Sequence, residues 1–115
     1  MPYFLHQVSY TPETWSMLIA NPQDRMDAIR APIEKLGGRI QTGYFAFGEF
    51  DVAVITEMPD NISAAAIAMA FAGGGAVKSL KTTPLMTTAE ALDALKKASM
   101  CGYRPITAAA RAASS

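Results

Sequence analysis

The chain has little of the two residue types that build most metal and redox sites. Its 115 residues include one cysteine, Cys101, and one histidine, His6. A lone cysteine cannot form an internal disulfide, a pattern typical of reducing compartments, so we expect a cytoplasmic protein. The usual Cys and His ligands of zinc cannot be assembled from one of each. We therefore expect no metal site and no cofactor.

Excess charge and long apolar runs are also absent. Lys plus Arg number 10, as do Asp plus Glu, so the formal net charge is zero. This balance argues against nucleic acid or an anionic membrane as the main partner. The most apolar window, 62–77, is shorter than the roughly 20 residues of a membrane helix. The first ten residues have no basic segment followed by an apolar run, so we expect no signal peptide.

What the chain does have is a regular alternation of strand and helix patterns. Its length suits one domain, which we expect over residues 1–102, followed by a tail of small residues over 103–115. The predicted strands are 3–10, 39–48, 50–58 and 76–83, and the predicted helices are 12–19, 22–36, 62–72 and 87–99.

Several boundaries have specific chemical signals. Asn21 can cap the second helix with Pro22 in its first position, and Gly48-Glu49 can form a tight hairpin turn between the second and third strands. Thr87 and Glu90 form the pattern of a capping box. In the first strand, Phe4, His6 and Val8 face one side of the sheet, opposite to Tyr3, Leu5 and Gln7.

The order β-α-β-β-α-β with an extra C-terminal helix predicts an α+β, ferredoxin-like domain with helices on one face of an antiparallel sheet. We expect the first and last strands each to pair with a central strand and not with each other. The third strand is apolar on both faces, so both are predicted to be buried. One chain cannot cover both, which favours a homodimer, or a higher oligomer, with its sheets packed face to face.

The chain also resembles the GYD domain family over roughly residues 3–98. The resemblance rests on "GEFDV" (48–52), the strand exit "VITEMPD", the alanine-rich helix after it and "VKSLKTTPLM". Phe50 stands where the family's Gly-x-Tyr-Asp-like turn has tyrosine, so a phenol is missing from this turn. The resemblance implies a dimeric α/β-barrel assembly, shared with small monooxygenases and stress-responsive proteins, and leaves the activity open.

Three ionisable side chains are candidates for catalysis, and each has a structural alternative. Asp51, two residues after Glu49, can act as an acid or base or can bind backbone N–H groups at the turn. His6 can be a general base, a haem ligand or a polar group lining a barrel cavity, or it can be a core histidine with satisfied hydrogen bonds. Lys81 can bind an anion or can protect a sheet edge from aggregation.

Other side chains are candidates for ligand binding. Aromatic residues can line a pocket or can belong to the core or a dimer interface, and the hydroxyl of a threonine at the end of the last strand can donate to a ligand. These candidates are Tyr10, Trp15, Tyr44, Phe47 and Thr83.

Three functions remain open. The first is an oligomeric protein that binds a small molecule or acts as an accessory protein. The second is a cofactor-poor enzyme, similar to a monooxygenase or isomerase, that uses His6, Asp51 and Lys81 on a small hydrophobic ligand. The third is a purely structural assembly element, suggested by the charge-free helix 62–72. A shared cavity for the three ionisable groups would favour the enzyme, and a cavity-free interior would favour the structural element.

Overall fold

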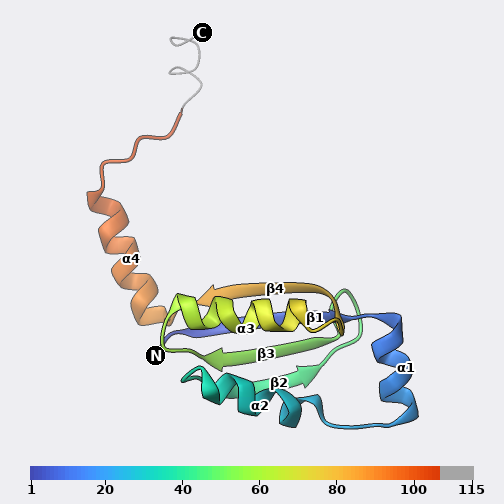
Figure 1. The fold of residues 1–115 in the computed structure, drawn as a ribbon. Helices are drawn as coiled ribbons and strands as arrows, with labels where there is room; N and C mark the ends of the chain where they lie inside the picture. Colours follow the sequence, from blue (N-terminus) through green and yellow to red (C-terminus); the bar gives the residue numbers. More distant parts are fainter. Residues whose placement is uncertain (107–115) are drawn as a thin grey trace. The chain divides into compact units, whose positions relative to one another are not determined.

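The computed structural model describes residues 1–106, and the rest of the predicted tail, 107–115, lies outside the described residues. The chain divides into two compact units, Met1–Leu85 and Met86–Ser115 (Figure 1). The first unit contains the whole sheet and three of the helices, and the second contains helix α4 (Thr88–Met100). The extent of the predicted domain, residues 1–102, stays a prediction.

The sheet of the first unit has four antiparallel strands in the order β2-β3-β1-β4. The strands are β1 (Tyr3–Tyr10), β2 (Arg39–Phe45), β3 (Val52–Glu57) and β4 (Val77–Leu85). This α+β arrangement confirms the predicted element order and is compatible with a ferredoxin-like fold. The prediction that the first and last strands do not pair is wrong, because β1 pairs with β4 along its whole length. Each β-α-β crossover skips one strand position, so β1 lies between β3 and β4.

Polar side chains fix where the helices begin. Thr11 caps α1 (Pro12–Ala20), and Asp60 caps α3 (Asn61–Gly73) by accepting from the Ser63 backbone N–H. The capping box of Thr87 and Glu90 at the start of α4 is present as predicted. Such caps satisfy backbone donors that have no partner inside the helix.

The predicted start of the second helix is wrong. Helix α2 (Arg25–Lys35) begins three residues after Pro22, and its cap is Asp24, whose carboxylate accepts from the Met26 N–H at 2.9 Å. A nearer side-chain acceptor therefore replaces Asn21. Gly37, with a φ of +83°, follows the end of this helix, where a left-handed residue is expected.

The predicted tight turn between β2 and β3 is also wrong. Strand β2 ends at Phe45, and a six-residue connection leads to Val52. The Ala46 N–H donates to the Asp51 carbonyl at 2.7 Å, which closes this loop. The Asp51 N–H donates to the Val8 carbonyl at 2.8 Å, so the loop is attached to β1 as well as to its own hairpin.

The two faces of the sheet differ in what covers them. Phe4, His6 and Val8 share one face, as predicted from the alternation, and this face is buried, whereas Tyr3, Leu5 and Gln7 on the other face are half-buried. The buried face packs against α2 and α3 through two core clusters, composed of Phe4, Ile33, Met58, Ala64 and Ile67, and of Val8, Tyr10, Val52 and Val54. The opposite side, which we call the open face, contributes no residue to either cluster.

The open face has an apolar middle and a charged end. Leu5 and Ile55 lie opposite each other at its centre, flanked by Thr42 and Thr83. At one end the Arg39 guanidinium donates to the Glu57 carboxylate at 2.9 Å. This hydrogen bond lowers the pKa of Glu57. Within residues 1–106 no helix has both the length and the apolar character needed to cross a bilayer.

Candidate functional site

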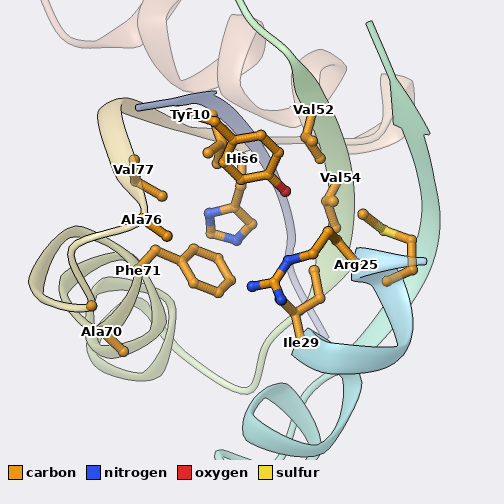
Figure 2. Close-up of a pocket in the computed structure, with 13 residues that line it drawn as sticks. His6, Tyr10, Arg25, Ile29, Val52, Val54, Ala70, Phe71, Ala76 and Val77 are labelled. Atoms are coloured by element: carbon orange, nitrogen blue, oxygen red, sulfur yellow. The ribbon is translucent and has the colours of Figure 1, made fainter. Parts of the chain in front are cut away.

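A cavity of about 180 Å³ lies between the buried face of the sheet and the helices α2 and α3 (Figure 2). Its walls are mostly apolar and come from alternate residues of β1 and β3, which point to the same side of the sheet. Small residues in the connection between α3 and β4 leave room on one side. The apolar walls are Val8, Met26, Ile29, Val52, Val54, Ala70, Phe71, Gly74, Ala76 and Val77. Three polar side chains join them, those of His6, Tyr10 and Arg25.

His6 is the most deeply buried of the three, with an exposed fraction of 0%. Its Nδ1 lies 2.9 Å from the Thr82 hydroxyl and its Nε2 lies 3.1 Å from the Thr56 hydroxyl. The edge of the ring meets Phe71, with ring centres 6.2 Å apart. Burial lowers the pKa of His6 and favours the neutral imidazole. Both nitrogens are thus engaged, and the ring supplies shape and polarity to the cavity without a charge.

Tyr10 and Arg25 stand together on another side of the cavity. Burial raises the pKa of the Tyr10 hydroxyl, and the nearby Arg25 guanidinium partly opposes this rise. The Tyr10 ring packs edge to face against Trp15 at 5.6 Å. The Nε atom of Arg25 is buried and has no hydrogen-bond partner in the described part of the chain. Arg25 makes no ion pair with any carboxylate of residues 1–106. Among these residues it is also the only Lys or Arg that lines the cavity.

Asp51 lies outside this cavity and binds the end of β1. Its Oδ2 accepts from the Tyr10 backbone N–H at 2.9 Å and from Trp15 Nε1 at 3.3 Å. The Tyr10 backbone adjoins an irregularity in the pairing of β1 with β4, between Ser9 and Tyr10. The carboxylate therefore satisfies a donor where the strand pairing is disturbed, which is the backbone-binding alternative of the two considered for Asp51.

The other predicted site residues point elsewhere. Lys81 pairs with Gln7 and Thr83 with Leu5, so both lie on the open face. Tyr44 and Phe47 are exposed by 68% and 102%. Three separate hollows contain His6, Asp51 and Lys81, so the structure does not bring the three proposed catalytic groups together.

Of the eight predicted site residues, His6 and Tyr10 line the cavity, and Arg25 was missed. In the sequence Arg25 looks like an ordinary charged residue near a helix start. Only the approach of α2 to the sheet turns its side chain inward, and no local pattern encodes that approach.

In residues 1–106 no cluster of three His, Cys, Asp or Glu side chains could hold a metal ion.

Comparisons with known proteins identify the family. A search of curated proteins returns no match, and neither does a search of solved structures. The family model described as GYD domain matches residues 4–95, which include the sheet and the cavity. The chain therefore belongs to the GYD domain family.

Proposed function

We propose that this protein binds a small, largely apolar molecule in the cavity between the sheet and α2 and α3. The observation that carries the proposal is the cavity itself, with a volume of about 180 Å³ and mostly apolar walls. An apolar cavity of about 150 Å³ in another protein is large enough for benzene. The ligand is accordingly one of single-ring size.

Binding explains the polar groups better than a reaction does. The alternative of a cofactor-poor enzyme relied on His6, Asp51 and Lys81 acting together, and these groups face three separate hollows. His6 uses both ring nitrogens on threonine hydroxyls, so it has no free nitrogen for a substrate proton. A purely structural element would need no cavity.

Toluene is the simplest probe of this proposal. A ligand that binds only the folded chain stabilises it by about 2.7 kcal/mol at a concentration of 100 times its Kd. We expect the melting temperature, followed by calorimetry, to rise with toluene concentration and to saturate. A melting temperature that stays constant up to the solubility limit of toluene would refute the proposal.

We also propose that two copies pack through their open faces. The face has an apolar centre at Leu5 and Ile55, and Tyr44 beside it is 68% exposed. Burial of such a surface against a second copy is stabilising by roughly 25 cal/mol per Å² of apolar area. With one cysteine in the sequence, the cytoplasm remains the proposed compartment.

Light scattering tests the homodimer. At micromolar concentration we expect twice the mass of one chain, and we expect Ile55→Lys to give the mass of one chain because it places a charge at the centre of the interface. Ile62→Lys on α3 is the control, since Ile62 is already 82% exposed and lies outside the sheet. A wild-type chain that scatters as a monomer would exclude the dimer.

A further inference from the structure

We infer that the ligand carries an anionic group, such as a carboxylate, which the Arg25 guanidinium binds inside the cavity. This inference rests on the proposed function, because it names the chemical class of the molecule that the cavity takes. The site consists of the Arg25 guanidinium, the Tyr10 phenol beside it and apolar walls around both.

The first argument is the unsatisfied donor of Arg25. Its Nε is buried and has no hydrogen-bond partner among residues 1–106. Buried polar groups nearly always have one, so an exception needs an explanation. The nearest acidic residues in the sequence are engaged or exposed: Asp24 caps the Met26 N–H, and Asp27 is exposed. Neither carboxylate supplies an acceptor for Arg25 Nε, so an acceptor on a bound ligand would satisfy it.

The second argument is where the guanidinium points. Figure 2 shows the Arg25 side chain reaching from α2 into the cavity, toward Phe71. Arginine presents its N–H donors in a planar fork that matches the two oxygens of a carboxylate. The Tyr10 hydroxyl lies close enough to interact with Arg25 and offers another O–H donor. An anionic group at this position would meet donors from two sides.

The third argument is the balance of charge and polarity in the cavity. Burial lowers the pKa of His6 and favours its neutral form, and none of the described residues that line the cavity has a carboxylate, so among them Arg25 sets the sign of the charge. Apolar side chains surround it, including Val54, Ile29 and Phe71. Charge-assisted hydrogen bonds are stronger where water is excluded. The remaining volume suits a single ring attached to the anion. The alternative is that a water molecule accepts from Nε. The cavity would then show no preference for an anionic ligand.

Three ring compounds of similar size separate these cases: benzoate, benzamide and toluene. We expect benzoate to bind about ten- to a hundredfold more tightly than benzamide, from the usual strength of hydrogen bonds between charged groups. Arg25→Met should abolish this preference and keep the binding of toluene, because methionine replaces the apolar stem of arginine and lacks the guanidinium. Arg25→Lys should keep part of the preference, since it retains the charge and loses the fork. Calorimetric titration at neutral pH measures all of these affinities.

The matched control is Arg30→Met, because Arg30 lies on the same helix, is exposed and does not line the cavity. It should leave the benzoate preference unchanged. Without ligand, Arg25→Met should melt no lower than wild type, because it removes a buried donor that has no partner. A drop in its melting temperature would indicate a structural role for Arg25.

The failures of the two proposals are distinguishable. If none of the three compounds binds, the proposed function fails and this inference fails with it. If toluene and benzamide bind and benzoate binds no better, only the anionic group is wrong. Survival of the benzoate preference in Arg25→Met would show that another group binds the anion, and would also overturn the inference.

Discussion

Replacing His6 with leucine is expected to lower the free energy of unfolding by about 2–4 kcal/mol, because a buried hydroxyl that loses its partner costs about 1–3 kcal/mol. His6 is fully buried and joins Thr56 on β3 to Thr82 on β4 across the middle of the sheet. Thr56 is also 0% exposed, so its hydroxyl has no contact with bulk water. Denaturant unfolding of the two proteins measures the difference.

A triple variant is the control for this result. His6→Leu combined with Thr56→Val and Thr82→Val removes both partners of the network together, which is close to neutral when the shapes are preserved. We expect it to recover most of the stability lost in His6→Leu. If the triple variant is as unstable as the single one, packing around the ring and not the hydrogen bonds accounts for the loss.

The same proteins give a pH readout. Burial lowers the pKa of His6, so the unfolded chain binds a proton at a higher pH than the folded chain does. Stability is therefore fully present above the unfolded pKa of about 6.5 and falls as pH decreases from there, by at most about 1.4 kcal/mol per pH unit. The triple variant should lack this component. The lowered pKa values of Glu57, Asp60 and Glu90 act in a more acidic range, below their ordinary values.

Ala70→Trp is expected to weaken binding of toluene and benzoate by more than about tenfold, since each lost 1.4 kcal/mol of binding free energy is a factor of ten. Ala70 lines the cavity from α3 and is itself exposed, so it lies at the rim, where a tryptophan would obstruct the opening without displacing the core. Calorimetric titration of both compounds measures the effect.

Ala72→Trp is the matched control, because Ala72 is an exposed residue of the same helix that does not line the cavity. It should bind both compounds as wild type does. Equal weakening in the two variants would mean that bulk on α3 acts through the helix and not by obstructing the cavity. Unchanged binding in both would place the ligand outside the cavity.

Local chemistry explains which parts of the fold could be predicted. The alternation of Phe4, His6 and Val8 and the capping box at Thr87 depend on neighbours along the chain, and these predictions are confirmed. The pairing of β1 with β4 was predicted wrongly, because strand order depends on which positions the crossovers skip. The predicted tight turn between β2 and β3 was also wrong, because the Asp51 backbone N–H donates to the carbonyl of Val8, which is distant in the sequence, and this hydrogen bond attaches the loop to β1.

The candidate site could also be predicted only in part. His6 was selected from the sequence as an ionisable residue and Tyr10 as an aromatic one, and both line the cavity. Lys81 was grouped with His6, although strand register sets it opposite Gln7, on the other side of the sheet. A shift of one residue in register exchanges the two faces, so no composition of β4 could fix this choice. Arg25 depends on how α2 approaches the sheet, which is a tertiary property.

The central claim is that the cavity between the sheet and α2 and α3 is where this protein takes its ligand. Methyl NMR of the full chain during a benzoate titration tests it most directly. We predict shifts at the cavity methyls of Val8, Ile29, Val54 and Val77, and none at Ile33, a buried core residue that does not line the cavity. Shifts confined to Ile55 on the open face, or no shifts up to saturating benzoate, would contradict the account.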